Sequence, residues 1–323
     1  MRYNSIMDLS LAPIEQKDQW ETFLLAHRPQ ALFQSWQWGE VEKKLGAKVW
    51  RWGWFHKQTL VGVAQIQKVT AKRGTFLHVR HGPIGNINFQ DLKKLAIAEG
   101  AWFIRVSPQV HVDTVYKKLG FTPAAIHEVD AECCWVLDID KTEEELLMGM
   151  RKTTRYEIKR AQKMDVKITK NKKADDFFSL YNQTSERQNF VRHGGINEEL
   201  EIMDSLVFTA THESRPIASA IILFRAGEAI YHHGASVPNK VGASYLVQWE
   251  AILEAKKRGK KLYNFWGIAP EDNPNHPWRG ITLFKKGFGG REVNYIHAQD
   301  FAISPLYIIP KIIEEIRRRW RGY

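Results

Sequence analysis

The stretch KVWRWGWFHKQTLVGVAQIQKV, residues 48–69, has a counterpart in LVFTATHESRPIASAIILF, residues 206–224. In both, β-branched, aromatic and other apolar residues stand on either side of a short polar break, which lies at residues 213–216 in the second stretch. Such a pattern predicts two strands joined by a turn. Because it occurs once in each half of the chain, it indicates an internal repeat.

The segments that follow these strand pairs repeat in the same order. After a further strand, we expect a helix at residues 91–99 in the first half and at residues 243–258 in the second. The next strand is expected at residues 102–106 and 261–266, and each half then carries a Gly-Phe element, KKLGF or FKKGF. This β-β-β-α-β order resembles the acetyltransferase-like (GNAT) fold. The predicted fold class is therefore α/β (α+β), with two tandem GNAT (acyl-CoA N-acyltransferase)-like domains.

Domain boundaries follow from the repeat. The junction is expected near residues 138–142, where Thr142 begins a capping box at the start of a helix. We predict a first domain at residues 1–140, a second at residues 141–303, and a C-terminal helix at residues 304–323. The sequence has no sustained heptad repeat, so we expect no coiled-coil arm.

Composition restricts the class of protein. The 323 residues carry 47 basic and 36 acidic side chains, a net charge of +11, which suggests an anionic partner such as nucleic acid, a nucleotide or a membrane surface. No apolar run reaches the ~18 residues of a spanning helix. The two cysteines, Cys133 and Cys134, are adjacent and offer neither a disulfide framework nor metal-ligand spacing. We therefore expect a cytoplasmic protein in a reducing compartment.

The excess positive charge is concentrated in one segment. Residues 151–173 hold ten basic residues and only two acidic ones. A predicted helix from residue 143 carries an apolar stripe at steps of three and four, and the same spacing on another face brings together Lys152, Arg155, Lys159 and Lys163. Simple solvation and anion binding are both open readings of this face.

The stretch YNFWGIAPEDNPNHPWRGITLFKKGFGG, residues 263–290, is the most informative for function. Its three prolines rule out a helix across the loop, and its glycines allow a close backbone approach beside Lys285 and Lys286. Long loops in compact domains are usually functional. We expect a site that handles anionic charge here, although an exposed surface lysine is the simpler reading of Lys285.

Familiar catalytic patterns are missing from the sequence. A CoA-dependent GNAT enzyme needs a glycine-rich loop before a helix, whereas residues 239–244 contain a single glycine. The HExxH, GxSxG and Walker patterns do not occur. His232 and His233 are consecutive on a predicted strand, so we expect them to point to opposite faces and not to share a metal ion. CoA chemistry is disfavoured, and no cofactor is expected.

Several motifs, in order along residues 33–300, closely resemble the Fem family (FemABX) of non-ribosomal peptidyltransferases, which build the cross-bridge of bacterial peptidoglycan. They are FQSWQWG at residues 33–39, FIRVSP at 103–108, EEELLMGMRKTTRYEIKRAQKMDV at 143–166, ER at 186–187, GAS at 234–236, WEA at 249–251 and the stretch at 263–290. The absence of a heptad repeat resembles the compact, FemX-like form of the family.

The resemblance implies a reaction. The donor would be an aminoacyl-tRNA, and the acceptor an amine on the stem peptide of a peptidoglycan precursor, either lipid II or UDP-MurNAc-pentapeptide. Because the donor ester is already activated, no ATP, metal or covalent nucleophile is required. By similarity, Phe284 and Lys285 would hold the acceptor end of the tRNA and stabilise developing negative charge.

The remaining site residues are expectations of the same kind. By similarity, the diphosphate of the acceptor would be held after the ER element, at Arg192 or His193, and near the Trp motif, where Glu42 stands at the matching position and Lys43 follows it. The full set of expected substrate contacts is Trp38, Lys43, Arg192, His193 and Tyr231. The expected tRNA contacts are Arg155, Lys159, Lys163 and Lys286.

The C-terminal helix has an apolar stripe and a basic end. We predict that the stripe packs on the first domain and that the arginines touch the inner membrane surface only weakly; a membrane-surface helix is the alternative. The stripe consists of Leu306, Ile309, Ile312, Ile313, Ile316 and Trp320. A monomer is expected. The rival functions are an N-acyltransferase that uses acyl-CoA or another amine, and a non-catalytic RNA-binding module.

Overall fold

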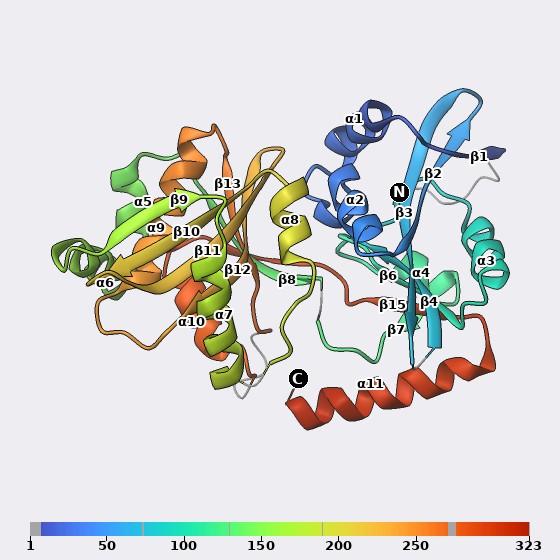
Figure 1. Ribbon diagram of the computed structural model, residues 1–323. Helices are drawn as coiled ribbons and strands as arrows, with labels where there is room; N and C mark the ends of the chain where they lie inside the picture. Colours follow the sequence, from blue (N-terminus) through green and yellow to red (C-terminus); the bar gives the residue numbers. More distant parts are fainter. Residues whose placement is uncertain (1–7, 73, 129, 189, 271–275, 323) are drawn as a thin grey trace. The chain divides into compact units, whose positions relative to one another are not determined.

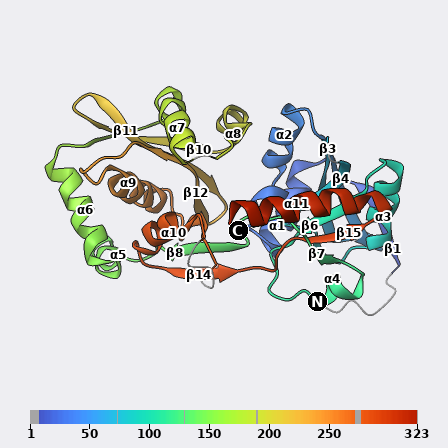
Figure 2. The same ribbon diagram turned by 90° about the horizontal axis from the view of Figure 1, so that it is seen from below.

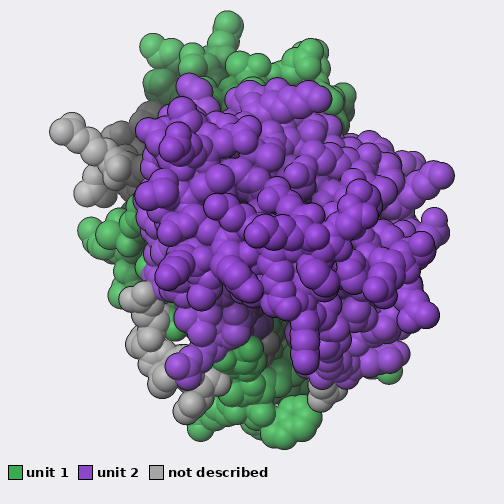
Figure 3. All heavy atoms as spheres, turned by 90° about the vertical axis from the view of Figure 1, so that its left-hand side faces the viewer, with its two compact units in different colours: residues 1–133, 270–277, 294–323 green, residues 134–269, 278–293 purple. Residues whose placement is uncertain are grey.

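The computed structural model describes residues 8–72, 74–128, 130–188, 190–270 and 276–322. These residues form two compact units (Figure 1), which are coloured separately in Figure 3. Unit 1 comprises Met1–Cys133, Pro270–Pro277 and Asn294–Tyr323, and unit 2 comprises Cys134–Ala269 and Trp278–Val293. The middle of the proline-rich loop, residues 271–275, lies outside the described residues.

Unit 1 is built on a sheet of eight strands in the order β1-β2-β3-β4-β6-β15-β7, with β5 paired to β3. Its strands are β1 (Leu9–Pro13), β2 (Lys48–His56), β3 (Thr59–Ala71), β4 (Gly74–Arg80), β5 (Ile84–Gly85), β6 (Phe103–Ser107), β7 (Thr122–Pro123) and β15 (Gln299–Ala302). Its helices are α1 (Lys17–His27), α2 (Trp36–Lys44), α3 (Phe89–Ala98), α4 (Thr114–Lys118) and α11 (Ile308–Arg321), with short 3-10 turns at Leu32–Gln34 and Pro305–Tyr307.

Alternation of side chains along the strands divides the core of unit 1 into two clusters. Ala64 and Ile66 of β3 face a cluster that includes α3 residues, whereas Val63, one position away, belongs to a cluster with Trp20 and Leu24 of α1. Opposite faces of a strand alternate with a period of two, so β3 contributes to both layers. The strand pair predicted at residues 48–69 is therefore present, and the middle of its second strand is buried on both faces.

Unit 2 contains a sheet of seven strands in the order β14-β8-β13-β12-β11-β10-β9. The strands are β8 (Cys133–Asp138), β9 (Lys167–Asn171), β10 (Ser205–His212), β11 (Arg215–Arg225), β12 (Glu228–Ser236), β13 (Leu262–Gly267) and β14 (Arg291–Asn294). The helices are α5 (Glu143–Gly149), α6 (Lys152–Lys163), α7 (Asp175–Gln188), α8 (Ile196–Ile202), α9 (Ala243–Lys257) and α10 (Arg279–Lys286).

Helices cover both faces of the second sheet, as Figure 2 shows for α9 and α7. Ala220 and Ile222 of β11 lie in the cluster that also contains Leu246 and Ile252 of α9. The alternate residue Ile221 is also fully buried. This burial on both faces explains why the sequence of β11 is a continuous apolar run.

Each unit contains the same sequence of connections. In unit 1, β4 is followed by the two-residue β5, by α3 and then by β6, which pairs with β4 in parallel. In unit 2, β12 is followed by α9 and then by β13, which pairs with β12 in parallel. Antiparallel strands precede both crossovers. The internal repeat seen in the sequence therefore appears as two similar arrangements of strands.

The segment predicted as one helix from residue 143 is two helices. The backbone is extended at Met150 and Arg151, with ψ angles of 155° and 147°, so α5 ends before the second helix begins. The capping box at Thr142 is present. The guanidinium Nη1 of Arg155 donates to the carbonyl oxygens of Leu147, Met148 and Met150 at 3.2, 3.2 and 2.6 Å. A side chain on α6 thus binds carbonyl oxygens at the end of α5.

The C-terminal segment differs from the sequence expectation in two respects. Residues 299–302, expected in the second domain, form β15 between β6 and β7 of the first sheet. The apolar stripe of α11, expected to pack inward, is turned outward: Ile312, Ile316 and Trp320 are 51%, 62% and 84% exposed. Among the described residues, none of the helices combines the length and apolar character needed to cross a bilayer.

A buried ion network explains the orientation of α11. Arg105 of β6 donates to both carboxylate oxygens of Asp300 at 2.7 Å and to Glu314 of α11 at 3.2 and 2.7 Å. The hydroxyl of Tyr307 also donates to Asp300 at 2.9 Å. Because Glu314 must face Arg105, the isoleucines on the other side of the helix face solvent.

Candidate functional site

The two parallel strands of unit 2 separate soon after they pair. The ladder between β12 and β13 joins Glu228 to Leu262, Ala229 to Tyr263 and Ile230 to Asn264. Beyond it, β12 continues to Ser236 and β13 to Gly267. The register also shifts on the other side of each strand, between Ile221 and Ile222 of β11 and between Asn264 and Gly267 of β13. The sheet therefore opens where Tyr231 and Gly267 lie.

Lys285 of α10 reaches this opening from the side. Its ammonium donates a hydrogen bond to the carbonyl oxygen of Gly267 and lies 5.8 Å from the ring centroid of Tyr231. The side chain is buried, with 7% of the residue exposed, so it is not the surface lysine of the simpler reading. Burial lowers the pKa of Lys285 to about 7. The amine can therefore gain and lose a proton near neutral pH.

The groups beside Lys285 stay protonated at neutral pH. Burial raises the pKa of Tyr231 to about 12 and that of the Cys134 thiol to about 12. Gly234 makes room for the tyrosine, because a Cβ atom there would lie 1.9 Å from the Tyr231 hydroxyl oxygen. The gap between β12 and β13 thus contains a lysine that changes its charge near pH 7 and a phenol that stays protonated and can donate a hydrogen bond.

Phe284 lies among aromatic rings. Its ring centroid is 4.9 Å from that of Tyr245 and 5.3 Å from that of Phe288, in edge-to-face arrangements. Tyr245 is on α9, so these contacts hold α10 against α9 and thereby fix the position of Lys285.

Lys286 lies inside unit 2 rather than on an open basic face. Its ammonium is 3.2 Å from Glu292 and 5.0 Å from the ring centroid of Trp135, and only 14% of its side chain is exposed. Arg155 is also occupied, because it binds the end of α5. Of the four residues expected to contact tRNA, Lys159 and Lys163 remain exposed on α6.

The exposed face of α6 combines cations with an aromatic ring. Lys152, Tyr156, Lys159 and Lys163 follow one another at steps of four, three and four, which places them on one side of the helix. Tyr156 is 61% exposed. The buried side consists of Thr154, Ile158 and Ala161.

The start of α9 is covered by α6. Gly242, the residue before α9, has φ of 74°, and a Cβ atom there would lie 2.4 Å from the carbonyl oxygen of Glu157. A carboxylate oxygen of Glu157 would be 2.9 Å from the same Cβ position. An acidic side chain therefore stands where a CoA-dependent GNAT enzyme would present free N–H groups to a pyrophosphate.

The segment after α7 carries the second pair of expected acceptor contacts. Arg192 is exposed and donates to the side-chain oxygen of Asn182. The backbone N–H of His193 donates to the Tyr181 hydroxyl at 3.3 Å. The ring centroid of His193 is 5.9 Å from that of His233. This segment is thus anchored to α7 and lies beside β12.

In unit 1, the Trp motif forms an aromatic and charged cluster. Trp38 is buried and donates its ring N–H to Glu42 at 3.0 Å. The Arg80 guanidinium lies 3.4 Å from the ring centroid of Phe33 and 5.6 Å from that of Trp38. It also pairs with Asp130 at 2.8 Å. Sequence reasoning missed Arg80, because the stacking depends on β4 lying beside the Trp motif.

Lys43 lies away from that cluster. It is exposed and pairs with Glu40 at 3.2 Å, one turn earlier on α2. The neighbouring Glu42, not Lys43, is the residue that contacts Trp38 and Arg80.

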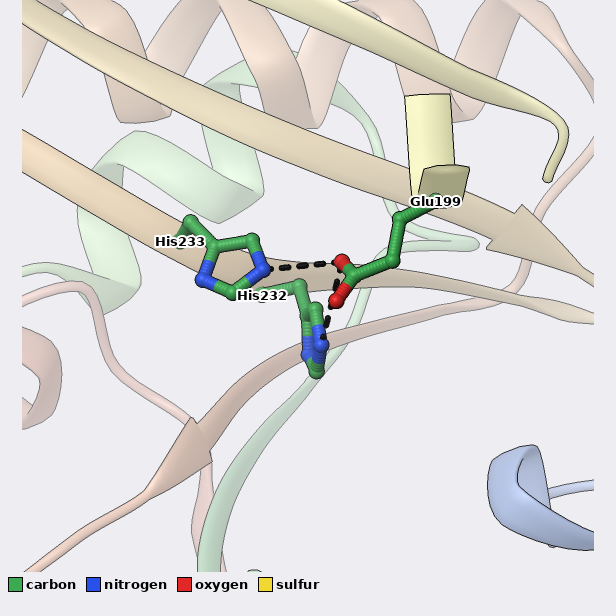
Figure 4. Close-up of side chains that lie close together, drawn as sticks. All are labelled: Glu199, His232 and His233. Atoms are coloured by element: carbon green, nitrogen blue, oxygen red, sulfur yellow. Dashed lines mark hydrogen bonds and ion pairs between the residues drawn. The ribbon is translucent and has the colours of Figure 1, made fainter. Parts of the chain in front are cut away.

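The expectation that His232 and His233 point to opposite faces is wrong. Figure 4 shows both imidazoles directed at the carboxylate of Glu199 on α8. The reason is the register shift of β12: Ile221 pairs with His233 and Ile222 with Tyr231, so His232 is an extra residue in a β-bulge. The sequence shows the two consecutive histidines, but it does not predict the bulge that brings their side chains together.

Comparison with known proteins identifies the family. The FemAB family matches residues 113–195 and 195–314, more than half of the chain. The chain is 20% identical to the "Lipid II:glycine glycyltransferase" of Staphylococcus haemolyticus, over 93% of this chain and 94% of that protein. The matches to "Aminoacyltransferase FemA" of Staphylococcus epidermidis span only about a quarter of that protein, at 26% identity.

Solved structures agree on the fold. The chain superposes on the crystal structure of FemX with a TM-score of 0.78 at 17% identity, covering 94% of this chain and 100% of that one. A tandem GNAT protein from the clavulanic acid biosynthesis pathway gives a TM-score of 0.55 at 9% identity, covering 92% and 99%. The predicted α/β class with two GNAT-like halves is confirmed. With its family profile matched over more than half of its length, the chain belongs to the FemAB family.

Proposed function

We propose that this protein is an aminoacyltransferase that moves an amino acid from aminoacyl-tRNA to the stem-peptide amine of a peptidoglycan precursor. The observation that carries the proposal is the buried Lys285 at the point where β12 and β13 separate. Family membership supports the reaction class, and the name of the Staphylococcus haemolyticus relative supports a lipid-linked muropeptide as acceptor.

The reaction needs little chemistry beyond positioning. The acceptor nitrogen attacks the ester carbonyl carbon of the donor, a C–N bond forms, and the C–O bond to the terminal ribose breaks. The proton lost by the nitrogen ends on the ribose oxygen. Negative charge develops first on the carbonyl oxygen and then on the departing ribose oxygen.

Lys285 can stabilise the negative charge at both stages, first on the carbonyl oxygen and then on the ribose oxygen. In its protonated form it stabilises an oxyanion through a short charge-assisted hydrogen bond. With a pKa of about 7, it can also give its proton to the ribose oxygen at little cost. The Tyr231 ring lies beside the ammonium, and Phe284 holds α10 in place through Tyr245.

The exposed face of α6 is the proposed contact for the tRNA. Its lysines at 152, 159 and 163 would neutralise phosphates, and Tyr156 offers a ring on which a base can stack. Arg155 and Lys286 contribute indirectly, the first by joining α5 to α6 and the second by fixing β14 beside β8 through Glu292.

Acyl-CoA is a weaker candidate as donor. The carboxylate of Glu157 at the start of α9 would repel a pyrophosphate at the place where GNAT enzymes bind it. This disfavours the CoA-dependent rival on electrostatic grounds.

The acceptor is assigned to the remaining expected contacts. The two regions are separate, alternative places for a phosphate of the acceptor. On unit 2, Arg192 and His193 offer a cation and hydrogen-bond donors. On unit 1, Arg80 offers a cation, and the buried Trp38 packs beside it. Lys43 adds an exposed charge on the same helix as Trp38.

We further propose that the protein works in the cytoplasm, as a monomer, and rests on the inner membrane face through α11. The exposed Ile312, Ile316 and Trp320 form an apolar side, and Arg317, Arg319 and Arg321 are exposed beside them. Such an amphipathic helix lies in the plane of an anionic membrane surface. A lipid-linked acceptor would then be within the same layer.

A reconstituted transfer assay tests the function. Purified protein is given a panel of charged tRNAs and either lipid II or UDP-MurNAc-pentapeptide. Transfer of a labelled amino acid only when tRNA and muropeptide are both present supports the proposal. Equal transfer from an acyl-CoA donor would favour the N-acyltransferase rival, and tRNA binding without any transfer would favour the RNA-binding rival. Lys94→Ala, at an exposed site on α3, is the matched control for Lys285→Ala.

A further inference from the structure

We propose that Glu199, His232 and His233 form a binding site for a divalent transition-metal cation of the zinc class. The three side chains lie in unit 2, on α8 and on β12, and each is at most 8% exposed. The inference does not depend on aminoacyl transfer, since it rests on the donor atoms alone.

The backbone of β12 is shaped so that neighbouring histidines converge. In a regular strand, residues 232 and 233 would lie on opposite faces. The bulge opposite Ile221 and Ile222 removes that alternation. Bulges commonly re-aim side chains next to functional sites. A strand that only needed one imidazole to neutralise Glu199 would not require this distortion.

The distances fit a small coordination sphere. The Nε2 atoms of His233 and His232 are 2.8 and 3.5 Å from the same carboxylate oxygen of Glu199, Oε2. One donor atom from each residue can be chosen so that all three lie within 4.8 Å of one another. Zinc–nitrogen and zinc–oxygen bonds of about 2.0–2.1 Å in a tetrahedral site place ligand atoms roughly 3.3 Å apart. The ion therefore needs only small side-chain shifts to enter.

The donor set selects the type of metal. Two imidazoles and one carboxylate are ligands for zinc, cobalt, nickel or copper, whereas magnesium and calcium prefer oxygen donors. Three protein ligands leave a fourth tetrahedral position for water. Bound in this way, the ion would join α8 to β12 at the residue following Tyr231.

Aromatic rings limit access of bulk water to the cluster. The ring centroid of Trp266 is 5.2 Å from that of His232, and those of Phe177 and His193 are 6.4 and 5.9 Å from that of His233. A dry surrounding strengthens the attraction between a cation and a carboxylate. It also raises the cost of leaving Glu199 charged without a partner.

A second histidine and glutamate cluster in unit 1 is arranged differently and serves as a control. His297 uses Nδ1 toward Glu132 at 2.6 Å and Nε2 toward the carbonyl oxygen of Ala124 at 3.0 Å. Both ring nitrogens are engaged, so His297 has no nitrogen to offer a metal without losing a hydrogen bond.

The test is metal titration of the full chain without an affinity tag, after treatment with a chelator and desalting. We expect one equivalent of Zn²⁺ to bind by calorimetry, and Co²⁺ to give the intense visible absorption of a tetrahedral complex. Mg²⁺ should not bind at this site. Zn²⁺ should also raise the thermal unfolding midpoint of the wild type, because a ligand that binds only the folded state stabilises it.

Variants then locate the site. Glu199→Gln and His232→Asn should each weaken Zn²⁺ binding by at least about 10–100-fold, the effect known for loss of an outer-shell partner alone. His297→Asn should leave the affinity unchanged. Absence of Zn²⁺ binding to the wild type, an octahedral Co²⁺ spectrum, or equal affinity in the wild type and in folded Glu199→Gln would overturn the proposal. If Glu199→Gln does not fold, the Co²⁺ spectrum and the Zn²⁺ stoichiometry of the wild type, together with His232→Asn, still test whether the site exists.

Discussion

The ammonium group of Lys285 is hydrogen-bonded to the carbonyl oxygen of Gly267, at the end of the strand that has just parted from β12. The contact holds a cationic group at a fixed place in a low-dielectric opening. Its consequences can be measured through the dependence of rate and stability on pH.

The transfer rate should fall as pH rises through about 7 if protonated Lys285 stabilises the developing charge, because the pKa of Lys285 is about 7 and its cation is lost above that value. Lys285→Ala should lower the rate by roughly 10²–10³-fold. Lys285→Arg stays charged throughout, so its falling limb should move to higher pH. Single-turnover rates measured between about pH 5.5 and 9 give the profile. A falling limb at the same pH in both proteins would contradict the assignment.

Stability should also depend on this lysine. Its folded pKa of about 7 lies below the value of about 10.4 in an unfolded chain, so the unfolded state binds more protons between these two values. The free energy of unfolding should therefore rise with pH across that window. Lys285→Met removes the titrating group, and its gain in melting temperature over the wild type should be largest below about pH 7 and shrink toward pH 9. A constant difference across this range would be inconsistent with a buried amine.

The exposed lysines of α6 and its partly buried Arg155 should behave differently. Replacing Lys159 and Lys163 with Gln should flatten the salt dependence of tRNA binding, at about 0.7–0.9 log units of slope for each lost phosphate contact, and leave stability unchanged. Arg155→Met should lower the free energy of unfolding by roughly 1.5–3 kcal/mol, because it removes charged hydrogen bonds to the end of α5. Filter binding at several salt concentrations and urea unfolding separate the two roles. A flatter salt dependence in Arg155→Met, with no change in the lysine double variant, would instead assign the tRNA contact to Arg155.

Membrane association should depend on the outward face of α11. Ile312→Glu combined with Ile316→Glu should abolish co-sedimentation with vesicles containing anionic lipid, whereas Ile97→Glu, at a 67% exposed isoleucine on α3, should not. Binding should weaken at high salt, since each arginine adds only about 1 kcal/mol of attraction to the surface. Unchanged sedimentation of the double variant would show that the stripe serves another partner.

The ion network beneath α11 should be costly to break. Arg105→Met leaves the carboxylates of Asp300 and Glu314 buried without their cation, and we expect a loss of about 3–5 kcal/mol in unfolding free energy. Adding Glu314→Gln should recover part of it. Lys94→Met, which removes an exposed ammonium 3.8 Å from Asp91, should change stability by less than about 1 kcal/mol. Denaturant unfolding of the four proteins provides the comparison.

Elements with a strong local pattern could be predicted from the sequence. The strands around residue 213 appear as β10 and β11, and the helix expected at residues 243–258 is α9. These segments have apolar periodicity and short turns, so their conformation depends mostly on neighbours in the chain. The capping box at Thr142 is predictable for the same reason.

Features that depend on distant partners could not be predicted. The break after α5 depends on Arg155, and the outward turn of α11 on Arg105 of a strand two hundred residues earlier. The convergence of His232 and His233 depends on a bulge against β11. The sequence identified Lys285 through its motif, but its burial depends on tertiary contacts of α10 with α9 and with the end of β13. In each case a tertiary contact overrides the local pattern.

The position of β15 between β6 and β7 has a consequence for synthesis of the chain. At about 5–20 residues per second, the ribosome needs roughly ten to thirty seconds between residue 133 and residue 302. Throughout that interval, in which unit 2 is synthesised, β6 lacks one hydrogen-bonding neighbour and presents an open edge. The unit that is translated first is therefore the last to be completed. A nascent chain interrupted between residues 294 and 298 would contain a complete second unit and a first unit with an open, aggregation-prone strand edge.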